Sequence, residues 1–176
     1  SIGRQVQVQL VPGPEIDVTE VVVSLTSNQV LSWDVVPGMR PTLLFGEAVH
    51  AIFTTKEHPD YIAALARRGI TDVDNVQIDP WPAGAFGYPA EKNRRIARCI
   101  SFLRTDPQDN GYARPIEGLI VHFDLGRKEV IEVIDHGIVT LPTEHGRYFA
   151  PDCEPLRTDL KPIEIRQPEG PSFTVD

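Results

Sequence analysis

The histidines are the first candidates for chemistry, because an imidazole can bind a metal ion or move a proton near neutral pH. The chain has five of them, His50, His58, His122, His136 and His145. No two form a His-x-His or His-x3-His pair, which would bring two ligands together on one element. The spacing of His136, His145 and Cys153 matches no arrangement typical of zinc or copper. The sequence therefore predicts surface or loop histidines and no metal site.

The two cysteines are the next candidates, because a thiolate can act as a nucleophile beside a base. Cys99 stands among apolar residues of a predicted strand and is expected to be a buried small hydrophobe. Cys153 could act only with a base such as His145, and this pair defines one hypothesis, an independent small hydrolase. No Gly-x-Ser-x-Gly elbow and no glycine-rich phosphate loop is present in the sequence. Two cysteines in 176 residues also favour a reducing compartment, and we expect a cytoplasmic protein.

Two aromatic residues have the most unusual local setting. Trp81 stands between Pro80 and Pro82 directly after a predicted strand, and Tyr112 lies in the polar segment 109–115. Rigid aromatic side chains in loops at strand ends can form an edge that faces a ligand. The alternative is that Trp81 closes the end of its own hydrophobic core, and the sequence alone leaves both open.

The elements that would position these residues begin with a β region. Valine, leucine and glutamine alternate from Val6 to Leu10, the pattern of a half-buried strand, and residues 20–25 and 29–36 predict two more. No helix precedes these strands to cover one face of the sheet. That face either packs on the rest of the chain or belongs with a helix upstream of Ser1.

The second region predicts helices followed by strands. A helix is expected after Thr42 as its N-cap, and another from Pro59 to the Arg67-Arg68-Gly69 stop signal. Predicted strands then follow at residues 73–79, 95–103, 118–125 and 129–134. This order is typical of an α+β fold in which helices pack on a four-stranded antiparallel sheet. We place the domain boundaries at 1–38, 39–140 and 141–176, the last segment being an extended, proline-rich arm.

The composition argues against two classes of partner, nucleic acids and membranes. The net charge of −8 argues against a nucleic-acid partner, whose phosphates need clustered lysine and arginine. No apolar run approaches the roughly 20 residues that span a bilayer, so we expect no membrane contact. The chain opens at Ser1 without Met and closes on a pattern at Asp176 that looks interrupted. We expect a piece of a longer protein.

Three stretches carry a resemblance to a known family. They are residues 109–125 (DNGYARPIEGLIVHFDL), the Asp79-Pro80-Trp81 segment with Ala83-Gly84, and residues 160–175. Together they resemble the N-terminal region of copper- and topaquinone-dependent primary-amine oxidases. The resemblance implies that residues 39–140 are a complete third N-terminal domain of cystatin-like fold. It also implies that residues 1–38 are the last strands of the second domain, and that residues 141–176 lead toward a catalytic domain.

The resemblance implies a chemistry that this chain does not carry by itself. Members of the family oxidise primary amines to aldehydes, releasing ammonia and hydrogen peroxide. They use a quinone made from the tyrosine of an Asn-Tyr-Asp/Glu motif and copper bound by three histidines. The sequence has no Asn-Tyr dipeptide and no His-x-His. We therefore expect no catalytic residue, metal ligand or cofactor here, with copper and topaquinone in the full-length protein, which would be a homodimer.

The function implied by the resemblance is a scaffold and one wall of the funnel by which a primary amine reaches the catalytic domain. The matching positions are Val49, Pro80, Trp81 and Tyr112. An alternative from another class is a stand-alone cystatin-like binding module without activity, and the Cys153–His145 hydrolase is a third.

Overall fold

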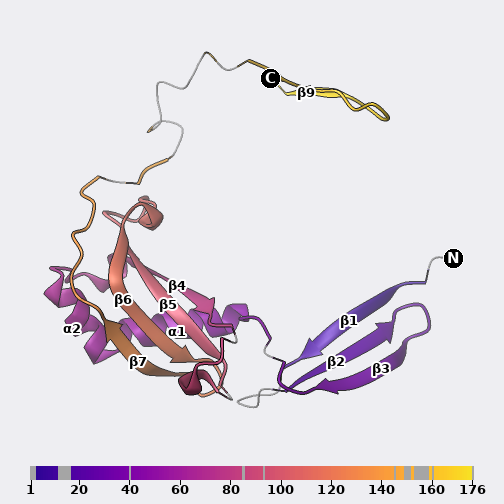
Figure 1. Cartoon of the computed structure of the whole chain (residues 1–176), viewed down its shortest axis with the longest axis horizontal. Helices are drawn as coiled ribbons and strands as arrows, with labels where there is room; N and C mark the ends of the chain where they lie inside the picture. Colours follow the sequence, from indigo (N-terminus) through magenta and orange to yellow (C-terminus); the bar gives the residue numbers. More distant parts are fainter. Residues whose placement is uncertain are drawn as a thin grey trace. The chain divides into compact units, whose positions relative to one another are not determined.

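The computed structural model describes residues 3–11, 17–39, 41–84, 86–92, 94–144, 146–148, 152, 159 and 161–175. The chain divides into two compact units, Ser1–Gly146 and Arg147–Asp176. The first contains a three-stranded and a four-stranded antiparallel sheet, and the second contains a two-stranded one (Figure 1). The predicted α+β class is confirmed. No helix in the described part of the chain is long and apolar enough to cross a membrane.

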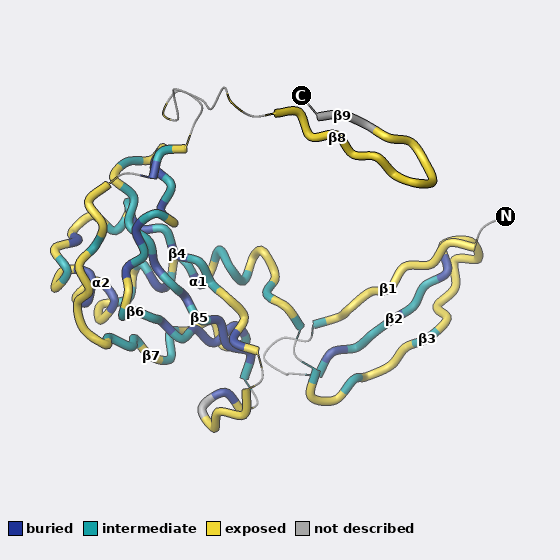
Figure 2. Tube along the Cα trace, turned by 45° about the horizontal axis from the view of Figure 1, so that its top comes forward, coloured by how far each residue is buried: buried dark blue, intermediate teal, exposed yellow. Residues whose placement is uncertain are grey.

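The three-stranded sheet has the order β1-β2-β3, with β1 at Gln5–Leu10, β2 at Val18–Ser24 and β3 at Gln29–Val36. The pairing places apolar side chains of all three strands on one face. Val8 lies opposite Val21, which in turn lies opposite Trp33. Most of this face is solvent-exposed, as the yellow tubes of β1 and β3 show in Figure 2. Its exposed members are Val6, Val8, Leu10, Val30, Trp33 and Val35.

The four-stranded sheet has the order β4-β5-β6-β7 and is covered on one face by two helices. The strands are β4 (Val76–Pro82), β5 (Ile96–Leu103), β6 (Pro115–Asp124) and β7 (Glu129–Asp135). The helices are α1 (Phe45–Glu57) and α2 (Pro59–Arg67). Helix α1 contacts all four strands, and α2 contacts α1 and β7. The predicted arrangement of helices on one face of a four-stranded sheet is confirmed.

The core lies between these helices and the sheet. Tyr61 and Leu65 of α2 are fully buried there, together with Val121 and Phe123 of β6. Burying each large apolar side chain contributes about 1.5–3 kcal/mol. The Tyr61 hydroxyl is not left without a partner, because its oxygen lies 2.7 Å from Oγ of Ser101.

The start of α1 differs from the prediction. The N-cap is Leu44 and not Thr42. The backbone N–H of Leu44 donates to Oε2 of Glu47 at 3.0 Å, and the Glu47 carboxylate is held by the buried Arg95. The bond from Leu44 to Glu47 satisfies an N–H at the helix start, and the ion pair with Arg95 is a tertiary contact that no local pattern reveals. Helix α2 has Pro59 in its first turn, as predicted, and Gly69 follows it with a φ of 76°.

Strand β4 also differs from the prediction, which ended a strand at residue 79 and placed Trp81 in a loop. A 3-10 turn occupies Val73–Asn75 (η1), and the strand runs on through Pro80, Trp81 and Pro82. The prolines fit because β4 is an edge strand. Backbone bonds from Arg104 to Asn75 and from Ala83 to Ile96 show that odd-numbered residues of β4 face β5 with their polar groups. The missing N–H groups of the two prolines fall on the free edge.

Strand β6 begins earlier than predicted and contains an irregularity. Ile100 pairs with Ile120, but Phe102 already pairs with Pro115, so extra β6 residues form a bulge. Gly118 in this bulge has a φ of 77°, and a Cβ there would lie 2.7 Å from the backbone oxygen of Gly137. Only glycine suits this position.

The second unit contains a hairpin within the predicted extended arm. Its strands are β8 (Ile163–Ile165) and β9 (Phe173–Val175), with Ile165 opposite Phe173. The side chain of Ile163 is exposed. The sequence patterns did not indicate these short strands.

Candidate functional site

Trp81 is an exposed aromatic on the edge strand of the four-stranded sheet, with 59% of its surface accessible. Its neighbour Pro80 lies opposite Cys99, which is in the core beneath the helices. Because adjacent residues of a strand face opposite ways, Trp81 lies on the face that the helices leave open. The interpretation of Trp81 as a plug for its own core is therefore wrong.

Two contacts place Tyr112 on the same open face. Its hydroxyl donates to Oδ2 of Asp79 at 2.6 Å, and its ring packs edge-on against Phe102 with 4.9 Å between ring centroids. The hydrogen bond to the Asp79 carboxylate raises the pKa of the Tyr112 phenol, and desolvation adds to this. At neutral pH Tyr112 is therefore a neutral donor that holds Asp79.

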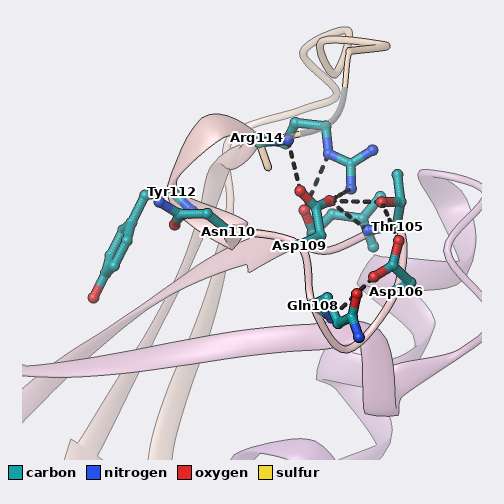
Figure 3. A network of polar contacts seen from close by, with 9 residues as sticks. Thr105, Asp106, Gln108, Asp109, Asn110, Tyr112 and Arg114 are labelled. Carbon is teal, nitrogen blue, oxygen red and sulfur yellow. Dashed lines mark hydrogen bonds and ion pairs between the residues drawn. The ribbon is translucent and has the colours of Figure 1, made fainter. Parts of the chain in front are cut away.

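The local sequence places Tyr112 through a tight turn. Residues Gly111–Ala113 form a 3-10 turn (η3) that is capped by Asn110, whose Oδ1 accepts from the Tyr112 N–H at 3.1 Å (Figure 3). Gly111 is buried against the sheet, and a Cβ at this position would lie 3.0 Å from Oε1 of Gln77. The close approach that glycine permits brings the turn onto β4 and β5 and directs the Tyr112 ring over Phe102.

The other two predicted site residues belong to the helix-covered side. Pro80 is half-buried opposite Cys99, and Val49 is half-buried on α1, which packs against β4. The structure thus brings Trp81 and Tyr112 to one edge of the open face. Pro80 lies at the same edge but faces the other way, and Val49 lies on α1, the helix that packs against β4.

Asp79 is the residue that the sequence interpretation missed. It shares a face with Trp81, two residues on in the strand, and it bonds to both Tyr112 and Gln77. The signal for it was the i, i+2 spacing, which counts only if Trp81 is in a strand. A carboxylate that bonds to one exposed aromatic residue and shares a strand face with another is suited to a cationic ligand. We call Asp79, Trp81 and Tyr112 the edge site.

The prediction that Cys99 is a buried small hydrophobe is confirmed. Cys99 is fully buried, and burial raises the pKa of its thiol to about 11, as expected for a small hydrophobe. Cys153 and His145, the proposed hydrolase pair, lie outside the described residues. Among the residues that are described, no three His, Cys, Asp or Glu side chains are grouped so as to hold a metal ion.

The fold and the site define a class of protein, an α+β domain with an aromatic and acidic edge. Comparison with known proteins identifies the family. Residues 47–152 match the family model described as "Copper amine oxidase, N3 domain". The chain is 36% identical over 176 residues to a primary amine oxidase of Arthrobacter sp. (strain P1), covering 99% of this chain and 27% of that protein. It is 43% identical over 121 residues to the histamine oxidase of Arthrobacter globiformis, covering 68% of this chain and 18% of that protein.

A solved structure agrees with the fold. The crystal structure of a copper-containing benzylamine oxidase from Hansenula polymorpha matches with a TM-score of 0.66 and 21% identity, over 100% of this chain and 29% of that one. The chain therefore belongs to the copper amine oxidase family and contains its N3 domain. It spans 27% of the first relative named above. The described part of the chain contains no group of His, Cys, Asp or Glu side chains that could hold copper.

Proposed function

We propose that this chain is a non-catalytic part of a copper amine oxidase and that its edge site forms one wall of the path taken by a primary amine. The edge site carries the proposal, because a carboxylate that bonds to one exposed aromatic residue and shares a strand face with another suits a protonated amine. Pro80 and Val49 would shape the same wall from the helix-covered side. The reaction implied for the full-length protein is the oxidation of a primary amine to an aldehyde with release of ammonia and hydrogen peroxide.

The physical role of the wall is to attract and to select. A cation that passes an aromatic face gains about 0.5–2 kcal/mol, depending on how far it is desolvated. The Asp79 carboxylate adds attraction for the ammonium group, and the bulk of Trp81 limits the width of the substrate. These effects change the capture of the amine and leave the later chemical steps to other parts of the protein.

The test is substitution of Trp81 and Tyr112 by alanine in the full-length protein, with kcat/KM measured for a small alkylamine and a bulky aromatic amine. We expect kcat/KM to fall by roughly 2- to 30-fold for both amines, because that range corresponds to the energy of the contact between the ammonium group and the rings. The ratio of the two values should shift as well, because the aromatic bulk limits the width of the substrate.

Matched controls are available on other surfaces. Trp33 is 61% exposed on the three-stranded sheet, and Tyr148 is exposed in the second unit. Trp33→Ala and Tyr148→Ala should leave the ratio unchanged. An unchanged ratio in Trp81→Ala and Tyr112→Ala as well would remove the edge site from the amine path.

The remaining expectations for the full-length protein are part of the same proposal. We propose that copper and topaquinone belong to a catalytic domain outside this chain, for which this chain is a scaffold. We also propose that the full-length protein is a homodimer in the cytoplasm that contacts neither nucleic acid nor membrane. Membership of the copper amine oxidase family supports the copper, and the net charge of −8 supports the absence of a nucleic-acid partner.

A further inference from the structure

We propose that Asp109 is a positioning residue for Tyr112, because its buried carboxylate ties the turn that carries Tyr112 to the backbone of Gly146. The inference rests on the proposed role of Tyr112 in the amine path. We call Thr105, Asp109, Arg114 and Gly146 the Asp109 network. Figure 3 shows its carboxylate at the centre of the connection between β5 and β6.

The carboxylate of Asp109 has no exposed surface and accepts four hydrogen bonds. Its Oδ2 accepts from the Thr105 N–H at 2.7 Å, from the Thr105 hydroxyl at 2.8 Å and from the Arg114 guanidinium at 2.6 Å. Its Oδ1 accepts from the Gly146 N–H at 2.6 Å. One side chain thus joins both ends of the β5–β6 connection to a residue 37 positions further along the chain.

Gly146 is held from both sides of its backbone. Its N–H donates to Asp109, and its carbonyl oxygen accepts from the Asn110 N–H at 3.2 Å. A Cβ at Gly146 would lie 2.5 Å from the Cβ of Ala113 and 2.5 Å from the backbone oxygen of Asn110. The contact is therefore so close that a side chain at Gly146 would push the two segments apart.

The contacts of Gly146 fall on the residues that flank Tyr112. Asn110 caps the turn and Ala113 ends it, so the backbone of Gly146 covers the turn on both sides of Tyr112. If the Asp109 network opens, the turn loses this cover, and Tyr112 keeps its bond to Asp79, its packing on Phe102 and the seat of Gly111 on the sheet. The ring of Tyr112 would then sample other positions over the edge site.

The protonation state of Asp109 is consistent with a permanent connection. Burial alone would raise the pKa of this carboxyl, but the hydrogen bonds from Thr105 and Gly146 and the charge of Arg114 lower it to about 2. The carboxylate is ionised throughout the neutral range, so the connection does not switch near pH 7.

The test compares Asp109→Asn and Gly146→Ala with the control Asp106→Asn in the full-length protein. Asp106 lies in the same connection, and its carboxylate accepts from the Gln108 N–H and the Thr105 hydroxyl. For the first two variants we expect hydrogen–deuterium exchange in peptides covering 109–114 to become at least roughly tenfold faster. For the control we expect no change in the exchange rate. Gly146→Ala retains the charge of Asp109, so it carries the test if Asp109→Asn does not fold.

A second measurement separates positioning from stability. In the full-length protein, Asp109→Asn should shift the kcat/KM ratio of a bulky to a small amine in the direction of Tyr112→Ala. In the Tyr112→Ala background the same substitution should add nothing, because its effect passes through Tyr112.

Each other result has a distinct meaning. Unchanged exchange in both test variants would overturn the inference. The same holds if Tyr112→Ala shifts the ratio and Asp109→Asn does not, or if Asp109→Asn acts equally in both backgrounds. If exchange becomes faster but no variant, including Tyr112→Ala, shifts the kcat/KM ratio, the proposed amine path is overturned. The positioning role of Asp109 in that path is then overturned with it.

Discussion

Charged side chains that are buried and paired decide several local structures in this chain. Asp109, Glu47 and Asp135 each accept from an arginine whose side chain is almost fully covered. Removing one partner of such a pair leaves a buried charge without compensation, which costs more than the pair contributes. The cost of substituting a charged residue in this chain therefore depends on whether it has a buried partner, which the sequence alone does not show.

The pH dependence of stability follows from Asp109. Its pKa in the folded chain is about 2, below the ordinary value of 3.8. A lowered folded pKa stabilises the folded state above the ordinary value, and this contribution is lost as the pH falls from about 4 through 2. Urea unfolding between pH 6 and pH 2 should show a steeper loss for the natural chain than for Asp109→Asn. Equal slopes would mean that the carboxylate is not held as the structure indicates.

Gly118 provides a prediction about backbone strain. Gly118→Ala should lower the free energy of unfolding by about 2–4 kcal/mol, because the new Cβ meets the Gly137 oxygen and the residue keeps a positive φ. Gly69 is the control, since it has a φ of 76° but no atom within 4 Å of a new Cβ. Gly69→Ala should cost only about 1 kcal/mol. Equal costs in urea unfolding would contradict the proposed collision.

At the scale of elements, the junction between α2 and β7 is fixed by Arg68. Its guanidinium binds Asp135 at 2.6 Å and the Gly137 oxygen at 2.6 Å while its side chain is 2% exposed. Hydrogen bonds from Arg68 and then Arg67 hold the pKa of Asp135 well below its usual range. The last turn of the helix is thereby tied to the end of the last strand of the sheet.

Two neighbouring arginines allow this junction to be tested. Arg68→Ala should destabilise the chain by about 1.5–3 kcal/mol, because it removes the buried guanidinium that bonds to Asp135 and to the Gly137 oxygen. Arg67 binds the same carboxylate but is 55% exposed, so Arg67→Ala should cost less than about 1 kcal/mol. The comparison is made by thermal and urea unfolding, and similar costs would argue against the junction.

Most elements could be predicted from the sequence because their signals are local. Alternation located β1 and β3, and the Pro59 and Gly69 signals located α2. The end of β4 could not be predicted, because a proline fits a strand only where its missing N–H faces solvent, and that depends on the order of the strands. The edge site was predicted only in part, because Asp79 shares a face with Trp81 only if the strand continues to that residue. The bond from Tyr112 to Asp79 joins residues 33 apart, and no local pattern encodes it.

At the scale of the whole molecule, the open apolar face of the three-stranded sheet dominates the expected behaviour. A contiguous apolar face of this kind favours association with other apolar surfaces. We expect this chain, expressed as it stands, to bind a hydrophobic dye or to self-associate.

The face can be tested with one lysine. Trp33→Lys should reduce dye fluorescence and self-association, because it replaces an exposed member of the apolar face by a charge. Asp34→Lys introduces the same side chain at the next residue, which is exposed on the opposite face, and should leave dye binding unchanged. A monomer that binds no dye before substitution would contradict the prediction.

The two prolines of β4 have a consequence for how copies of the chain meet. A free sheet edge normally offers a row of N–H donors to which a strand from another molecule can add. Pro80 and Pro82 remove two successive donors from the outward side of β4, so an incoming strand could not extend its ladder of hydrogen bonds along this end of the edge. The edge that carries Trp81 is thereby protected against cross-β aggregation while its side chains remain open to small molecules.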